Sequence, residues 1–334
     1  MADPNKWLGL MRWSMKYCDG TTPPNATEMS QERRDFLDKV LKEAVIDESE
    51  RIKQILRILD GEHPSVVYEK KNDENDEELH NAEESKITEE DLELYKEALI
   101  DELLVRIDQI DNAQNFVKMN GFTVCLKVVN QSPRPALRAS AMEVISVVVQ
   151  NNPFCQNAAH QNGMLKMLCD LVKTDPDTTT RVKAFMAISC LIRNHQPSQQ
   201  EFLSERCYGK GLIEQCLESE DLRLQRKALF LSRSLTTTSD KFAREIVESK
   251  VFLDKLSAFI LSDDIDLCES SVDALVEIMQ ILPDSKELFC QPSCQIIDRL
   301  NQQLSALDSL DEEEKRYLAE TRQKVSDLRS WMQT

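Results

Sequence analysis

The chain has 334 residues, only seven glycines and a formal net charge of −18 at pH 7. So few glycines leave little material for the tight turns of a sheet-rich fold, and the composition favours long helices. The negative charge repels phosphate backbones and anionic lipid, so we expect neither nucleic acid nor a membrane as a partner.

The first segment, residues 1–24, carries much apolar mass close to the start of the chain. Its large apolar residues include Trp7, Leu8, Leu10, Met11 and Trp13. Glycine and proline in residues 19–24 separate it from the rest of the chain, and it lacks the apolar core of a secretory signal. We expect a mobile segment that itself binds a partner; the alternative is a helix packed on the body of the protein.

Residues 25–62 and 63–90 differ sharply in composition. The first range repeats apolar residues at helical spacing, with Ser30 as a candidate N-cap and Asp60-Gly61 as a stop signal, which predicts a helical hairpin. In the second range the composition turns acidic: residues 69–91 hold eleven acidic and three basic residues. This composition predicts a solvated acidic linker.

Residues 91–334 contain an internal repeat. Thr88 and Asp91 resemble a capping box ahead of a helix over residues 92–107. In the helix predicted over residues 181–193, Ala184 is followed by Ile188 and Leu191 at offsets of four and seven. The same pattern starts at three other alanines, and the four alanines (141, 184, 228 and 274) are 43, 44 and 46 residues apart.

A period of this length is typical of armadillo and HEAT arrays, in which each unit buries its apolar face against its neighbours. We therefore predict an all-α, armadillo/HEAT-like right-handed solenoid of about four repeats. The N-terminal hairpin precedes it, and a charged helix over residues 311–332 caps its C-terminal end.

The residues that catalysis or metal binding would need are not grouped in this sequence. Seven glycines do not form a phosphate-binding loop, and the four histidines are not paired at metal-ligand spacing. Cys290 and Cys294 have no second pair to complete a zinc site. We therefore expect no cofactor, no metal and no enzymatic activity, and we interpret the chain as an interaction protein.

The ten cysteines indicate a reducing compartment. Most of them lie inside apolar helical runs, where cysteine is usually a small buried hydrophobe. We therefore expect free thiols and a cytosolic protein, with the nucleus as a second location.

Several stretches together resemble one family, the armadillo-type nucleotide exchange factors of the seventy-kilodalton heat-shock (Hsp) chaperones, the Fes/Hsp-binding-protein group. The matching stretches are residues 10–14, 29–34, 110–113, 149–152, 181–184 and 188–195. The likeness covers nearly the whole chain, and the Asp-Asn-Ala turn at residues 111–113 is among its most specific parts.

The resemblance implies a co-chaperone whose concave face grips the nucleotide-binding domain of a cytosolic heat-shock chaperone. Opening of that domain would release ADP and then the bound polypeptide, with the apolar residues 7–13 acting as a substrate mimic. By the same resemblance, the concave face of the protein would include Asn112, Ala113, Asn151, Arg181, Asn194 and Arg226. We also expect the protein to act as a monomer.

Other roles are open for each of these residues. Asn151 and Asn194 could terminate helices, Ala113 could be a tight-turn residue, and Arg181 and Arg226 could be solvated first-turn residues. A different function is also open, that of an armadillo adaptor binding extended peptides. Such adaptors need tryptophans at repeat spacing, and this chain has none between Trp13 and Trp331.

Overall fold

The computed structural model describes residues 31, 34, 47–68 and 88–333. Contacts divide the chain into two units, residues 1–52 and 53–334, and each is described by itself. The predicted N-terminal segment, most of the first half of the predicted hairpin and most of the acidic linker lie outside the described residues. The described residues form helices and turns, with no strand among them.

Two helices precede the repeats. Helix α3 (Glu48–Leu59) crosses the boundary between the units and ends just before Asp60-Gly61, where Gly61 has a φ of 112°. Helix α4 (Pro64–Tyr68) is a short helix within the range for which we predicted an acidic linker.

The predicted capping box at the start of the array is confirmed. Helix α5 (Glu89–Ile107) begins after Thr88, whose Oγ1 accepts a hydrogen bond from the Asp91 backbone N–H at 3.1 Å. In return, the Thr88 backbone N–H donates to Asp91 Oδ2 at 3.2 Å. Asp therefore does here what Glu does in the usual box.

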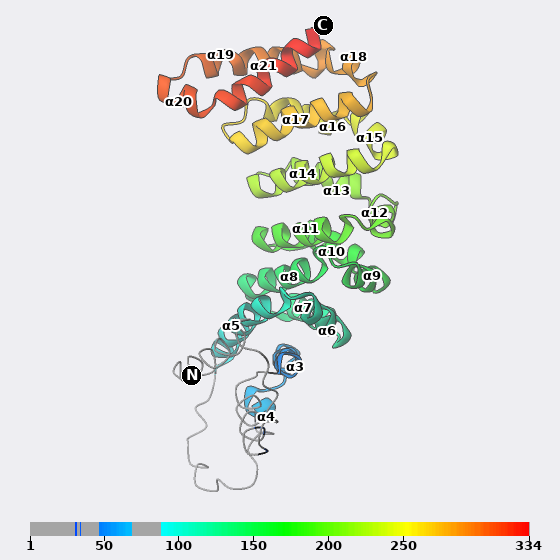
Figure 1. The fold of residues 1–334 in the computed structure, drawn as a ribbon, viewed down its shortest axis with the longest axis vertical. Coiled ribbons are helices and arrows are strands. Elements are labelled where there is room, and N and C mark those ends of the chain that lie inside the picture. The colour runs from blue at the N-terminus through cyan, green and yellow to red at the C-terminus, as the bar shows by residue number, and fades with distance from the viewer. Residues whose placement is uncertain (1–30, 32–33, 35–46, 69–87, 334) are drawn as a thin grey trace, which may run out of the picture. The chain divides into compact units, whose positions relative to one another are not determined.

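Four three-helix repeats follow α5, as predicted (Figure 1). The first comprises α6 (Ile110–Lys118), α7 (Gly121–Gln131) and α8 (Pro135–Val149), and the second α9 (Pro153–Gln161), α10 (Met164–Thr174) and α11 (Thr178–Ile192). The third comprises α12 (Gln196–Phe202), α13 (Gly209–Leu217) and α14 (Leu222–Thr238), and the fourth α15 (Asp240–Val247), α16 (Lys250–Phe259) and α17 (Ile265–Ile281).

The third helices of the repeats form one layer and the second helices another. Each of α8, α11, α14 and α17 packs against the third helix of the next repeat or the C-terminal helices, and against the second helix of its own repeat. The repeated triplet lies at these contacts: Ala184, Ile188 and Leu191 are fully buried, and Ala141, Ala228 and Ala274 are buried equivalently. The small alanines allow close approach, and the branched residues fill the space between the helices.

Asparagine ends two of the long helices. Helices α8 and α11 finish at Val149 and Ile192, and two residues later Asn151 and Asn194 have φ values of 52° and 57°. This left-handed conformation terminates helices, and Asn tolerates it better than most residues with a side chain. The alternative that these asparagines terminate helices is therefore confirmed.

Glycine is required where α6 turns into α7. A Cβ on Gly121 would overlap the ring of Phe116, which is itself fully buried. The residue before it, Asn120, takes the left-handed conformation with a φ of 61°. The two residues of this Asn-Gly pair have different roles: Asn120 adopts the left-handed turn conformation, and Gly121 leaves space for the Phe116 ring.

The C-terminal end differs in one respect from the prediction. After α18 (Ser285–Phe289), a 3-10 turn (Pro292–Cys294) and α19 (Ile296–Asp308), the single charged helix expected over residues 311–332 is two helices, α20 (Glu312–Tyr317) and α21 (Ala319–Gln333). Helix α20 buries no residue, whereas α21 buries Val325 and Leu328 and packs on α17 and α19. The chain changes direction between α20 and α21, where side chains begin to pack on α17 and α19. Helix α21 thereby covers the last repeat.

We predict that Ile188→Ala lowers the free energy of unfolding by about 2–5 kcal/mol, because it leaves a cavity between α11 and its neighbours. Met186→Ala, on the partly exposed side of the same helix, should cost less than about 1 kcal/mol. Urea denaturation of both variants checks this, and equal losses would contradict the layer assignment.

A second prediction separates backbone from side-chain roles at Asn194. Asn194→Ala should destabilise the protein by about 1–2 kcal/mol, since alanine resists a positive φ. Asn194→Gly should preserve stability because glycine adopts that conformation freely. Thermal melting of the pair is the measurement; a glycine variant as unstable as the alanine variant would show that the side chain carries the effect.

Candidate functional site

The long helices present one continuous, partly exposed surface, which we call the long-helix face. On each helix its residues recur at spacings of three and four, on the side away from the second-helix layer. The face comprises Ser140, Glu143 and Val147 of α8; Thr179, Lys183, Met186 and Cys190 of α11, with Arg193 directly after it; Arg223, Lys227, Phe230 and Ser234 of α14; and Asp266, Ser270, Asp273 and Glu277 of α17.

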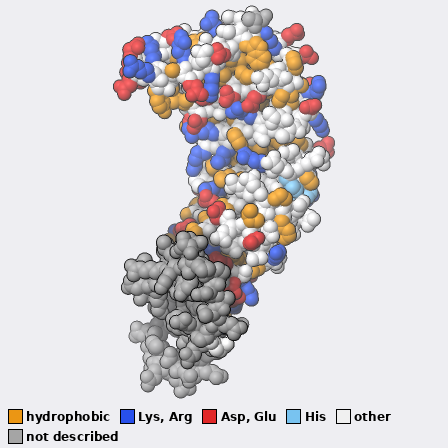
Figure 2. All heavy atoms as spheres, viewed as in Figure 1, with side chains coloured by type: hydrophobic (Ala, Val, Ile, Leu, Met, Phe, Trp, Pro, Cys, Tyr) orange, Lys and Arg blue, Asp and Glu red, His pale blue; other side chains and the backbone are white. Residues whose placement is uncertain are grey.

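Charge is unevenly distributed over this face. Its lysines and arginines belong to α11 and α14, whereas α17 contributes carboxylates only. Figure 2 shows blue side chains gathered at the level of α11 and α14, and red ones at the level of α17. A chain with a net charge of −18 therefore concentrates positive charge in the middle of one surface.

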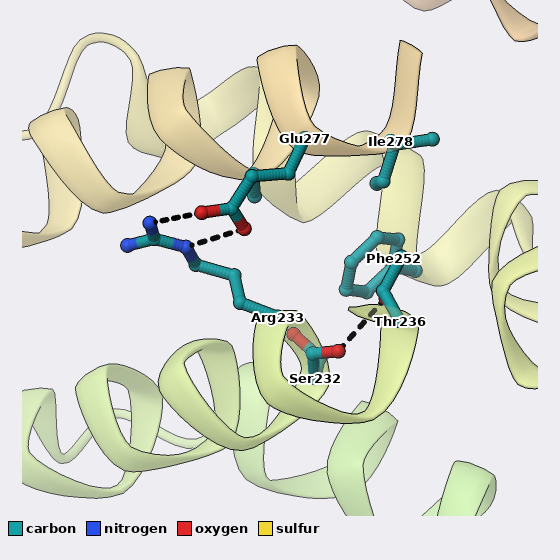
Figure 3. Close-up of a pocket in the computed structure, with 7 residues that line it drawn as sticks. Ser232, Arg233, Thr236, Phe252, Glu277 and Ile278 are labelled. Carbon is teal, nitrogen blue, oxygen red and sulfur yellow. Dashed lines mark hydrogen bonds and ion pairs between the residues drawn. The ribbon is translucent and has the colours of Figure 1, made fainter. Parts of the chain in front are cut away.

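Some charges on or beside this face form ion pairs between neighbouring helices. Lys183 of α11 pairs with Glu143 of α8 at 2.7 Å. Arg233 of α14 donates from Nε and one terminal nitrogen to the two carboxylate oxygens of Glu277 on α17, at 3.0 and 2.6 Å (Figure 3). The hydrogen bonds from Arg233 to Glu277 raise the pKa of Arg233. Such pairs fix adjacent repeats in register.

The space beside the Arg233–Glu277 pair is not a ligand site. It is lined by Ser232, Thr236, Phe252 and Ile278, as Figure 3 shows, and leaves no room for a water molecule. It is a packing void between α14, α16 and α17.

Three residues at the centre of the face, Arg193, Lys227 and Phe230, form what we call the cation–aromatic cluster. The Arg193 guanidinium lies 5.1 Å from the centroid of the Phe230 ring, and Phe230 is 51% exposed. Burial lowers the pKa of Lys227, and the nearby Lys183 lowers it further. Within the described part of the chain, no carboxylate forms an ion pair with Arg193 or Lys227.

The chemistry of this cluster suits an acidic protein surface. Two cations without internal counter-ions can receive carboxylates, and the exposed aromatic ring adds apolar contact area. Exposed aromatic and arginine side chains are the residue types that most often dominate protein–protein binding energies.

Two of the residues expected on the binding face are buried. Asn112 and Ala113 lie in α6 and are 7% and 3% exposed. Asn112 Nδ2 donates at 2.9 Å to the backbone oxygen of Arg106 in the last turn of α5. Both residues therefore help to join α5 to α6 in this structure, and their expected direct contact with a partner stays a prediction.

The two arginines predicted for the binding face, Arg226 and Arg181, form hydrogen bonds within the protein. Arg226 donates from Nε to Asp264 Oδ1 at 3.0 Å and lies 3.5 Å from Asp266, both on the α17 side. The hydrogen bond from Arg226 lowers the pKa of Asp264, which also caps α17. Arg181 is partly buried, and one terminal nitrogen donates to Thr178 Oγ1 at 2.9 Å.

The remaining expected residues lie at helix ends or beyond the described part of the chain. Asn151 and Asn194 are exposed at the ends of α8 and α11, just beyond the rows of the long-helix face. Trp7, Leu8, Leu10, Met11 and Trp13 lie outside the described residues. Four residues of the long-helix face were not predicted from the sequence: Lys183, Arg193, Lys227 and Phe230. Helical spacing along the two predicted long helices is a signal that could have identified them.

The described residues contain no group of three or more His, Cys, Asp or Glu side chains placed to hold a metal ion. Among the helices that the structure describes, none is long and apolar enough to cross a bilayer.

Similarity to solved structures agrees with the repeat architecture. The designed armadillo repeat protein YIII(Dq)4CqI is 11% identical, with a TM-score of 0.56 over 84% of this chain and 99% of that one. A computationally designed armadillo protein for modular peptide recognition gives a TM-score of 0.56 at 12% identity, covering 83% and 99% of the two chains. At these identities the likeness shows the fold alone.

Similarity of sequence is more specific. Hsp70-binding protein 1 of Macaca fascicularis is 23% identical over 312 residues, covering 92% of this chain and 80% of its own. Hsp70 nucleotide exchange factor FES1 of Coccidioides immitis is 39% identical over 95 residues, covering 28% of this chain and 44% of its own. Residues 112–231, which include the whole cation–aromatic cluster, match the model of the SIL1/FES1/HPBP1 C-terminal domain.

Proposed function

We propose that this protein is a co-chaperone that acts as a nucleotide exchange factor for an Hsp70 chaperone. The names of its relatives, Hsp70-binding protein 1 and Hsp70 nucleotide exchange factor FES1, support this function. The family domain and the armadillo-like fold support a binding role, because stacked repeats offer an extended surface for another protein.

The observation that carries the proposal is the cation–aromatic cluster. It lies within the family domain and is the part of the long-helix face where positive charge has no internal counter-ion in the described residues. We propose that the chaperone's nucleotide-binding domain supplies the missing carboxylates. Electrostatic attraction between the two surfaces would speed their encounter and fix their orientation.

The physical basis of exchange is differential binding. If the long-helix face binds the open, nucleotide-free form of the chaperone domain more tightly than the closed ADP form, it shifts the population towards the open form. Thermodynamic linkage makes the effect reciprocal. This protein weakens the affinity of the chaperone for ADP by some factor, and ADP weakens the affinity of the chaperone for this protein by the same factor. No covalent step is needed, and we propose none.

Further parts of the proposal concern surroundings and partners. The nine described cysteines are free thiols, which supports a reducing location such as the cytosol. The net charge of −18 argues against nucleic acid and anionic membranes as partners. We propose that the protein acts as a monomer, with its face available to the chaperone.

The alternative, an adaptor for extended peptides, gains less support. Armadillo adaptors rely on a ladder of tryptophans, and none occurs between Trp13 and Trp331. The centre of the long-helix face is positive, so only an acidic peptide would suit it.

We predict that the protein accelerates release of a fluorescent ADP analogue from an Hsp70 nucleotide-binding domain. Lys227→Glu should weaken binding to that domain at least tenfold, about 1.4 kcal/mol, because it replaces attraction by repulsion. Stability should change by less than about 1 kcal/mol, since Lys227 forms no ion pair within the described residues.

The matched control is Lys241→Glu, which makes the same change in net charge on α15, where the side chain is 81% exposed and away from the long-helix face. This variant should exchange nucleotide as well as the parent protein does. If saturating parent protein leaves the ADP off-rate unchanged, the exchange function is wrong. If both variants are equally impaired, net charge rather than the cluster governs binding.

We also propose that the apolar residues 7–13 act as a substrate mimic. Deletion of residues 1–20 should leave ADP release intact, because the long-helix face lies in the repeats. Release of a bound model polypeptide should slow when excess polypeptide competes to rebind. Parallel measurement of the two release rates tests this, and equal slowing of both would contradict it.

A further inference from the structure

The junction between α11 and α12 depends on one histidine. His195 follows Asn194 and is the N-cap residue of α12. Its side chain is 6% exposed, and its two ring nitrogens contact two different helices. Nδ1 lies 2.8 Å from Ser198 Oγ in α12, and Nε2 lies 3.0 Å from Asn157 Oδ1 in α9.

These contacts define the protonation state of His195. Nδ1 accepts a hydrogen bond from the Ser198 backbone N–H at 3.3 Å, so it carries no proton. The proton of the neutral ring is therefore on Nε2, which donates to Asn157 Oδ1. The cap of α12 exists only while the ring is neutral.

Among the residues that the structure describes, no carboxylate forms an ion pair with His195. The nearest titratable ring is His160 of α9, 5.9 Å away between centroids. The nearby carboxylate, Glu201 of α12, is engaged elsewhere, 2.8 Å from His160 Nδ1 and 3.4 Å from Arg206 of the loop after α12. Arg193, two residues earlier at the end of α11, adds another cation. Burial lowers the pKa of His195, and His160 lowers it further.

The preceding repeat performs the same task without a titratable group. There Asn151 takes the left-handed conformation and Asn152 caps α9, accepting a hydrogen bond from the Cys155 backbone N–H at 3.3 Å. Asn152 and His195 thus occupy equivalent positions. Histidine is therefore not needed to make the junction.

This junction also holds the end of α11 in place. Gln156 Nε2 of α9 donates to the backbone oxygens of Cys190 and Arg193, at 3.0 and 2.9 Å. The next residue, Asn157, is the partner of His195 Nε2. Helix α9 therefore contacts both sides of the turn from which Arg193 extends over Phe230 on the long-helix face.

We propose that His195 makes the junction of α9, α11 and α12 a pH-responsive device, closed when the ring is neutral and loosened when it is protonated. Protonation turns Nδ1 from an acceptor into a donor facing the Ser198 N–H, which abolishes the cap. It also places a positive charge at a helix N-terminus, where it is unfavourable. The further claim, that this loosening weakens chaperone binding through Arg193, rests on the proposed function.

The direction of the pH effect is set by the lowered pKa of His195. The unfolded chain binds the proton more readily than the folded chain, so the contribution of His195 to stability is complete above its ordinary pKa of about 6.5. That contribution is lost as the pH falls through the lower pKa of the folded state.

The test uses hydrogen–deuterium exchange of the full chain at pH 7.5 and pH 5.5, corrected for intrinsic exchange, with His195→Asn as the matched variant. Asparagine caps helices well and does not titrate in this range. We expect residues 190–202 of the parent protein to lose protection at pH 5.5, while the variant keeps it. Thermal melting should show the same divergence below about pH 6.5.

Equal pH dependence in the parent protein and His195→Asn would overturn the proposal. His160→Asn is the second variant, and it should still lose protection between pH 7.5 and pH 5.5. If this variant keeps its protection at pH 5.5, His160 and not His195 is the pH-responsive residue. Chaperone binding measured at both pH values separates the two claims. If the junction loosens at pH 5.5 but chaperone binding is not weaker, only the link to Arg193 is overturned. If the protein does not bind the chaperone at pH 7.5, the proposed function is contradicted, and the hydrogen–deuterium exchange result for His195 still holds.

Discussion

The structure depends on burial of small and branched side chains between successive long helices. Ala184, Ile188 and Leu191 of α11 have no exposed surface, and the other long helices repeat the arrangement. No single repeat could bury this face alone, so each is stabilised by its neighbours. Because the buried side of every long helix is used in this way, the opposite sides align as one surface.

Polar interactions on and beside that surface are of two kinds. Ion pairs such as Arg233–Glu277 and Arg226–Asp264 join one repeat to the next. The cation–aromatic cluster has no such internal partner among the described residues, and Lys227 is held close to another cation. Keeping such a cluster costs stability in the free protein, and an acidic partner would recover that cost on binding.

Much of the fold could be predicted because its signals are local or periodic. The spacing of the alanines located the four repeats, and Thr88 with Asp91 located the start of α5. The division of the last segment into α20 and α21 could not be predicted, because it depends on where α21 finds buried contacts on α17 and α19.

The site was harder to predict than the fold. Asn112 and Ala113 form a specific motif, but only the structure shows that the motif is buried at the joint of α5 and α6. Arg226 looks like a free anchor in the sequence, and only the packing of α14 on α17 brings it to Asp264. Conversely, Lys227 was selected for the proposed site because it lacks an ion-pair partner in the described chain, and the absence of a partner cannot be read from sequence.

The central claim is that the long-helix face, through its cation–aromatic cluster, contacts the chaperone. Site-specific photo-crosslinking tests it most directly, with benzoylphenylalanine in place of Phe230 and, as the matched control, in place of Tyr208, which is 62% exposed in the turn before α13. We predict a crosslink to the Hsp70 nucleotide-binding domain from position 230 and none from position 208. A crosslink from position 208 alone would contradict the claim.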